Sequence, residues 1–281
     1  MIRGHTMPTR HLDVPGGRLL VVDEGTGPPI VLLHAAVADL RAWDAVAQPL
    51  VAAGYRVIRF DARNFGGSSG DDVAFSYRAD VLAVLDSLGL ARAALVGNSR
   101  GGMTAVDTAI ESPERVVAVV GVGAGIGGFE SVPTPEELKT FAAYEAVDSA
   151  KPFDADALTG FEANVWLDGP GQPTGRVDPA IRAAFLTMAG PLNAPDHPRV
   201  REVPLEPAAN DRLEGLRCPV LFVAGELDFS DAVQAARRIE AAAPNGRALI
   251  WPDVAHMIGM EQPERLAAAI IEFLAPLERW T

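Results

Sequence analysis

Short apolar runs alternate along the chain with segments of helical periodicity. Strand-length apolar runs occupy 18–23, 30–33, 56–60, 93–96 and 116–122. Apolar residues recur at helical spacing over 40–53, 77–88 and 99–111. Such alternation is typical of βαβ units, in which helices join parallel strands. The pattern therefore predicts the α/β class, with a mostly parallel sheet flanked by helices.

This alternation stops at about residue 129 and resumes near residue 211. The intervening segment is rich in Pro, Asp and Glu and has helical patterns near 135–150, 154–168 and 178–189. Beyond it, strands are predicted at 220–224 and 248–251, and helices at 231–242 and 263–274. We expect a core of residues 1–128 and 211–281, interrupted by a helical cap of residues 129–210. Ligands are expected at the carboxyl ends of the strands, beneath the cap.

Composition narrows the class of protein. A chain of 281 residues with 48% hydrophobic residues can bury a large core without a disulfide or a structural metal. The single Cys218 is expected to be a packed thiol, which suits a reducing compartment and predicts a cytoplasmic location. A net charge of −13 argues against nucleic-acid binding, and no apolar run approaches the length of a membrane span. The composition leaves open whether the protein is a monomer or a homodimer.

The pattern G-x-S-x-G occurs twice, around Ser99 and around Ser68. A nucleophile elbow is a tight turn between a strand and a helix. Ser99 directly follows a predicted strand and opens a helical pattern, whereas Ser68 lies several residues beyond its strand and precedes no helix. We therefore predict Ser99 as the nucleophile. The alternative for Ser99 is a helix N-cap, a position that serine also favours.

A serine nucleophile needs a base, and the base needs a carboxylate that fixes its tautomer. His256 follows the last predicted strand and is the predicted base; the alternative is a surface-loop histidine. Asp228 follows the preceding strand and is the predicted acid, with Glu226 and Asp253 as alternatives. The order Ser, Asp, His along the chain is that of α/β-hydrolases.

Two backbone N–H groups are predicted to bind the oxyanion of the tetrahedral intermediate. One belongs to Arg100, directly after the nucleophile, and the other to Ala36, in the loop after strand 30–33. His34 precedes that loop. It is either a second functional histidine or a structural one that bonds the loop backbone, and we favour the structural role.

The chain resembles the α/β-hydrolase superfamily over nearly its whole length. Segments 32–36, 60–68 and 97–102 carry the resemblance, being similar to the family motifs L-L-H-G-x, D-x-R-G-x-G-x-S and G-N-S-x-G-G. The resemblance implies a serine hydrolase that uses no cofactor or metal, in which Ser68 has a structural role. Ala35 and Asn64 stand where the family usually has glycine, and a need for positive φ at position 35 would narrow the oxyanion loop.

The elbow and the sequence near the cap resemble two subgroups, enol-lactonase-like hydrolases and carbon–carbon bond hydrolases. We expect a small-molecule substrate, a carboxylic ester or lactone cleaved through an acyl-enzyme on Ser99 (an EC 3.1 activity). A carbon–carbon bond hydrolase or a perhydrolase with the same triad is the alternative. A ligand-binding protein with this fold and no turnover is the alternative of another class.

Specificity is expected to depend on the cap and on one unusual side chain. Arg100 replaces an apolar residue of the family motif, and its guanidinium is expected either to bind a substrate carboxylate or to pair with an acid of the cap. The alternative for the cap aromatics is that they only pack the cap onto the core. The candidates for pocket walls are Phe129, Phe141, Tyr144, Phe161, Trp166 and Phe185.

A dinucleotide-binding oxidoreductase is a further alternative, because 123–128 matches G-x-G-x-x-G after a strand. That fingerprint must open a helix at once. Here Pro133 and Pro135 follow within a polar stretch, and the motif lies mid-chain instead of in the first βαβ unit. The match therefore does not predict a nucleotide site.

Overall fold

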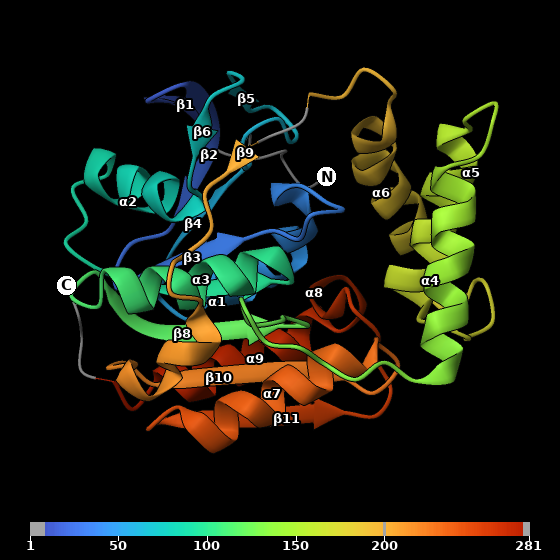
Figure 1. Cartoon of the computed structure of the whole chain (residues 1–281). Coiled ribbons are helices and arrows are strands. Elements are labelled where there is room, and N and C mark those ends of the chain that lie inside the picture. The colour runs from blue at the N-terminus through green and yellow to red at the C-terminus, as the bar shows by residue number, and fades with distance from the viewer. Residues whose placement is uncertain (1–8, 199–200, 278–281) are drawn as a thin grey trace, which may run out of the picture.

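A nine-stranded sheet forms the middle of the molecule in the computed structural model, which describes residues 9–198 and 201–277 (Figure 1). Its strands are β1 (Thr9–Val14), β2 (Gly17–Glu24), β3 (Pro29–Leu33), β4 (Arg56–Phe60), β5 (Ser69–Gly70), β7 (Ala93–Asn98), β8 (Val116–Val122), β10 (Val220–Gly225) and β11 (Gly246–Trp251). The order is β1-β2-β4-β3-β7-β8-β10-β11, with β5 beside β2. The strands from β4 to β11 in this order are parallel, and β1 and β2 form an antiparallel edge.

Helices cover both faces of the sheet. One face carries α2 (Tyr77–Ser87), α3 (Arg100–Glu111) and α7 (Ser230–Ala242), and the other carries α1 (Asp44–Ala52) and α9 (Pro263–Leu274). Alternate residues of β3 enter different cores: Val31 and Leu33 pack in the first, Ile30 and Leu32 in the second. A strand buried on both faces is apolar at every position, which explains the uninterrupted runs in the sequence.

The predicted elements of the core are confirmed, with some additions. β1 was not predicted, and a 3₁₀ turn at Leu40–Trp43 precedes α1 where one continuous helix was expected. The short helix α8 (Ile258–Glu261) and the two-stranded ladder of β6 (Ala74–Phe75) and β9 (Arg201–Glu202) were also not predicted. Residues 1–8, which the prediction placed in the core, lie outside the described residues.

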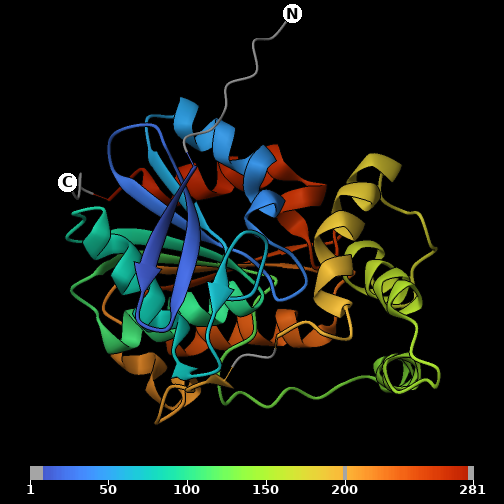
Figure 2. The ribbon, with the colours of Figure 1, turned by 90° about the horizontal axis from the view of Figure 1, so that it is seen from above.

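The segment between β8 and β9 forms the expected helical insertion, and it contains α4 (Pro135–Asp148), α5 (Ala155–Glu162) and α6 (Pro179–Ala189). Where a single helix was expected over 154–168, α5 passes into a π-helix at Ala163–Asp168. In both views the three helices stand beside the sheet, away from the helices that cover its faces (Figures 1 and 2). No helix within the described ranges is long and apolar enough to span a membrane.

Candidate active site

Ser99 occupies a sharp turn between β7 and α3. Its backbone has φ 54° and ψ −120°, a conformation that non-glycine residues rarely adopt. The turn is crowded: a Cβ on Gly97 would lie 2.1 Å from the carbonyl carbon of Gly101, and one on Gly101 would lie 2.2 Å from the carbonyl oxygen of Leu33. Ser99 stands at the N-cap position of α3, but its side chain makes no capping hydrogen bond to the helix.

Asp228 and His256 come from the loops that follow β10 and β11, and their side chains meet. His256 Nδ1 lies 2.8 Å from Asp228 Oδ2, and Asp228 Oδ1 accepts the N–H of Phe229. Glu226 is exposed, and Asp253 pairs with Arg265 at the surface, so neither alternative acid takes this position. The pair is buried, with His256 7% and Asp228 8% exposed.

Burial alone lowers the pKa of His256, because it disfavours the imidazolium. The charge of Asp228, its hydrogen bond and the more distant charge of Asp231 act in the opposite direction and outweigh burial. The net pKa of His256 is therefore raised above its usual value. A base with this pKa is a stronger proton acceptor, and it becomes charged at a higher pH than a free histidine.

The elbow and the histidine loop are joined by the residue before Ser99. The Asn98 amide nitrogen donates to the carbonyl oxygens of Val122, at 2.8 Å, and of His256, at 3.2 Å. Gly123 closes the same junction: a Cβ there would lie 3.0 Å from His256 O and 3.3 Å from Asp228 Oδ2. Three loops at the carboxyl ends of β7, β8 and β11 are thus packed against one another, which holds the turn of Ser99 against the loop that carries His256.

The glycine-rich stretch 123–128 begins with this close contact of Gly123. It forms a loop, and the next helix, α4, begins only at Pro135. A dinucleotide fingerprint needs its helix immediately after the glycines, so that interpretation is not supported.

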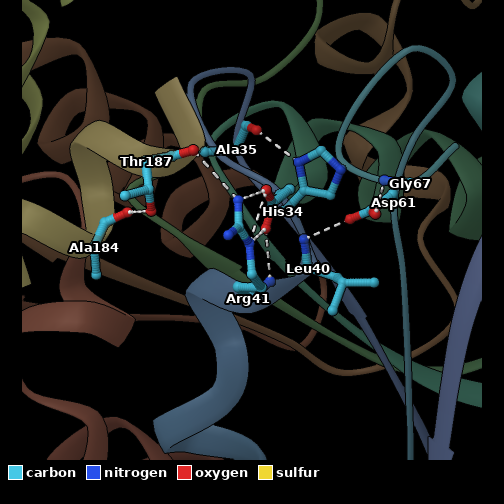
Figure 3. A network of polar contacts seen from close by, with 9 residues as sticks. His34, Ala35, Leu40, Arg41, Asp61, Gly67, Ala184 and Thr187 are labelled. Atoms are coloured by element: carbon cyan, nitrogen blue, oxygen red, sulfur yellow. Dashed lines mark hydrogen bonds and ion pairs between the residues drawn. The ribbon is translucent and has the colours of Figure 1, made fainter. Parts of the chain in front are cut away.

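His34 shapes the loop that carries the predicted oxyanion donor Ala36. The N–H of Ala62 donates to His34 Nε2 at 2.9 Å, so Nε2 carries no proton and Nδ1–H donates to Ala35 O at 2.8 Å. Figure 3 shows His34 facing Ala35. Burial and the nearby Arg100 charge lower the pKa of His34 to about 3, so the ring stays neutral. His34 therefore has the structural role favoured from the sequence.

The backbone angles show whether Ala35 and Asn64, which replace family glycines, adopt the positive φ that favours glycine. Among the described non-glycine residues, positive φ is found only at Asn64, with 63°, and at Ser99. Asparagine tolerates that conformation better than most residues. Ala35 does not adopt it, so its Cβ imposes no such strain on the oxyanion loop.

The loop that follows β3 is also connected to the cap. Arg41 forms an ion pair with Asp39 at 2.6 Å and reaches the carbonyl oxygen of Thr187, in α6, at 3.4 Å. Asp61 accepts the backbone N–H groups of Leu40 and Gly67 at 2.8 and 2.7 Å. These contacts are drawn in Figure 3, and among them the Arg41 side chain connects the 3₁₀ turn at the end of the loop to helix α6.

Arg100 contributes its backbone to the first turn of α3, where helical N–H groups lack partners within the helix. Its guanidinium lies between the rings of Phe65 and Tyr77, 4.3 and 4.6 Å from their centroids. Within the described residues it forms no direct ion pair; the nearest support for the cap-acid alternative is that, while burial lowers the pKa of Arg100, the charge of Glu202 raises it. Ser68, in the other G-x-S-x-G match, has its hydroxyl engaged by Leu20 N and Asp61 O.

Of the six cap aromatics, Trp166 reaches the catalytic candidates. Its ring centroid lies 4.7 Å from that of His256 and 5.2 Å from that of Phe229. Phe141 also stacks on Phe229, with 4.8 Å between the ring centroids. Phe229 was missed from the sequence, although its position directly after Asp228 was a usable signal.

The remaining aromatics make packing contacts. Tyr144 and Phe161 pack edge to face within the cap, and the Tyr144 hydroxyl donates to Glu162. Phe185, in α6, is completely buried in a cluster that includes Ala35 and Met257, and Phe129 packs against the core on the α3 face. In the part of the chain that the structure describes, none of these four rings makes a ring contact with His256.

Cys218 is buried at the start of β10, and burial raises the pKa of its thiol to about 11. A thiol with this pKa stays protonated at neutral pH, as expected for a packed residue. An open groove of about 750 Å³ lies between α4 and the start of α7. Asp228 is on its wall, but its lining includes neither Ser99 nor His256.

Comparison with known proteins identifies the family. The sequence pattern described as "Alpha/beta hydrolase family" matches residues 30–269. The chain belongs to this family.

Three relatives show the range of chemistry in it. A 2-hydroxy-6-oxononadienedioate/2-hydroxy-6-oxononatrienedioate hydrolase from Burkholderia vietnamiensis is 30% identical, with 90% of this chain and 89% of the relative covered. A rhodomycin D methylesterase from Streptomyces peucetius is 28% identical, with 94% and 97% covered. The structure of an N-acyl homoserine lactone degrading enzyme superposes with a TM-score of 0.72 at 25% identity, covering 94% of this chain and all of the other.

Proposed function

We propose that this α/β-hydrolase cleaves a small carboxylic ester or lactone through an acyl-enzyme on Ser99. The observation that carries the proposal is the strained turn at Ser99, whose backbone is tied through Asn98 to the loop of the hydrogen-bonded pair His256 and Asp228. Strain of this kind persists where the surrounding structure holds it, and it is characteristic of functional sites.

In the proposed mechanism, His256 takes the proton of the Ser99 hydroxyl as the oxygen attacks the substrate carbonyl. Asp228 holds the Nδ1–H of His256, so that Nε2 is the basic nitrogen, and stabilises the imidazolium. The N–H groups of Ala36 and Arg100 bind the oxyanion. His256 then protonates the leaving alkoxide, and water, activated by the same imidazole, releases the acid and restores Ser99.

A carbon–carbon bond hydrolase is the second candidate, favoured by the relative from Burkholderia vietnamiensis. The same triad would serve it, since the leaving group would be a carbanion equivalent instead of an alkoxide. The relatives that are named a methylesterase and a lactone degrading enzyme support the ester or lactone assignment. The two candidates differ in substrate and share Ser99.

The test measures hydrolysis of activated esters, lactones and 2-hydroxy-6-oxononadienedioate by the wild type, Ser99→Ala and Ser68→Ala. We expect Ser99→Ala to lose several orders of magnitude in kcat, as triad variants do elsewhere, and Ser68→Ala to remain active. Labelling by a fluorophosphonate should follow the same pattern. Hydrolysis that persists in Ser99→Ala refutes the proposal, and a wild type that binds a lactone but is neither labelled nor active indicates a ligand-binding protein.

A further inference from the structure

One arginine of the cap binds the end of the π-helix. Arg176 lies between that helix and α6, and its Nε donates to Asp168 O at 2.6 Å while Nη2 donates to Leu167 O at 3.0 Å. These are carbonyl groups of the last residues of the π-helix, where helical partners are lacking. The guanidinium therefore closes the end of the helix that carries Trp166.

The remaining nitrogen of Arg176 binds the loop of His256. Nη1 lies 2.6 Å from Glu261 Oε2 and 3.4 Å from Asp253 O. The other carboxylate oxygen of Glu261 accepts the N–H of Ala255 at 2.7 Å. Ala255 directly precedes His256, so one ion pair connects the cap to the backbone of the proposed base. The Glu261 carboxylate is only 5% exposed, so this pair is shielded from solvent screening.

Close packing accompanies these bonds. Gly169 follows the π-helix with φ 103°, and a Cβ there would lie 2.4 Å from Leu227 O and 3.4 Å from the Ala255 side chain. The end of the π-helix thus abuts both loops of the Asp228–His256 pair.

The π-helix is also held from within the cap. The Asp168 carboxylate is fully buried and accepts from Arg182 Nη1 at 2.6 Å and from the N–H groups of Gly175 and Val177. A single-turn π-helix inside a helical segment is frequently found at a functional site. Here it places the Trp166 ring against the His256 imidazole.

We propose that Arg176 and Glu261 are positioning residues, which set the orientation of His256 through the seating of the cap. The inference rests on the proposed function, because it assigns the imidazole of His256 as the base. Misplacement of a catalytic group by about 1 Å costs roughly a hundredfold in rate, so a buried link to the adjacent backbone has a measurable effect on kcat.

The test uses three variants: Arg176→Met, Glu261→Gln and the double variant that combines them. Each is compared with the control variant Arg265→Met. Arg265 is the matched control, because it forms an ion pair of similar length with Asp253 of the same loop but is exposed, and its other contact is with the ring of Trp251 in the core. We expect kcat to fall about tenfold to a hundredfold in each single variant, with a smaller change in KM. The double variant should lose no more than Arg176→Met alone, since the ion pair that Glu261→Gln breaks is already absent there.

A pH profile separates positioning from general destabilisation. The charged groups that raise the pKa of His256 are Asp228 and Asp231. The double variant removes one positive and one negative charge, so its net charge is unchanged. If the imidazole turns away from Asp228, the acidic limb of kcat/KM moves to lower pH, whereas in Arg265→Met it stays in place.

Wild-type kcat and an unshifted acidic limb in the double variant would overturn the proposal, as would equal losses in Arg265→Met. Arg176→Lys, which keeps the charge but not the fork of donors, should recover part of the activity. If Arg176→Met does not fold, Glu261→Gln carries the test, because its amide oxygen still accepts from Ala255 N. Failure of the proposed function is recognised separately, by activity that persists in Ser99→Ala.

Discussion

Replacing Gly123 by alanine tests the packing beneath the proposed base and acid. Gly123 has φ 51°, where alanine costs roughly 1–2 kcal/mol, partly offset by about 0.4–1 kcal/mol from the restricted unfolded chain. The added Cβ would lie 3.0 Å from His256 O and 3.3 Å from both His256 Nδ1 and Asp228 Oδ2. The pair must therefore shift by a few tenths of an ångström.

The two effects have different expected sizes. Net destabilisation of about 1 kcal/mol lowers Tm by roughly 2–4 °C in a chain of this size. A shift of a few tenths of an ångström in the base costs about tenfold in kcat/KM, or roughly 1.4 kcal/mol of activation free energy. Steady-state hydrolysis of an activated ester, corrected for active protein by fluorophosphonate titration, measures the second effect.

Gly89→Ala is the matched control. Gly89 ends helix α2 with φ 66°, and a Cβ there would meet no atom within 4 Å. It therefore carries the same backbone penalty without crowding the site, and only its Tm should change. If Gly123→Ala keeps wild-type kcat/KM while its Tm falls as in Gly89→Ala, the close packing against His256 has no catalytic importance.

Two further predictions concern the triad and the second G-x-S-x-G match. Asp228→Asn should lower kcat by several orders of magnitude and move the acidic limb of kcat/KM to lower pH, because the charge that raises the pKa of His256 is lost. Asp253→Asn should keep the wild-type kcat and the wild-type acidic limb, and the reverse result would make Asp253 the acid. Ser68→Ala should be destabilised by about 1–3 kcal/mol in urea unfolding, since Leu20 N and Asp61 O lose their partner, and an unchanged midpoint would show that these bonds contribute nothing.

Much of the core could be predicted from the sequence, because buried parallel strands have continuous apolar runs and the helices between them have clear periodicity. Val116–Val122 was predicted with its observed bounds. β1 was not predicted, since Thr9–Val14 is largely exposed and lacks the apolar run of a buried strand. Its pairing with β2 supplies a partner that local composition does not reveal.

In the candidate site, too, some features could be predicted from the sequence and others could not. Ser99, Asp228 and His256 follow strands whose ends meet at one edge of the sheet, so chain order alone placed them together. The contacts of Asn98 with His256, of Trp166 with Phe229 and of the Arg176 guanidinium with Glu261 join residues far apart in the chain. Their spacing has no period, so no local pattern could have indicated them.

The placement of the cap has a consequence for how such proteins diversify. β8 and β10 are direct neighbours in the sheet, although the entire cap lies between them in sequence, and the described pairing of β9 is with β6, outside the main sheet. Insertions, deletions or a wholesale exchange of the cap would therefore leave the ladder of the scaffold intact. If the proposed site is the active site, selection for new substrates can act on the cap while the proposed triad is inherited unchanged, provided that contacts such as that of Arg176 with Glu261 are rebuilt.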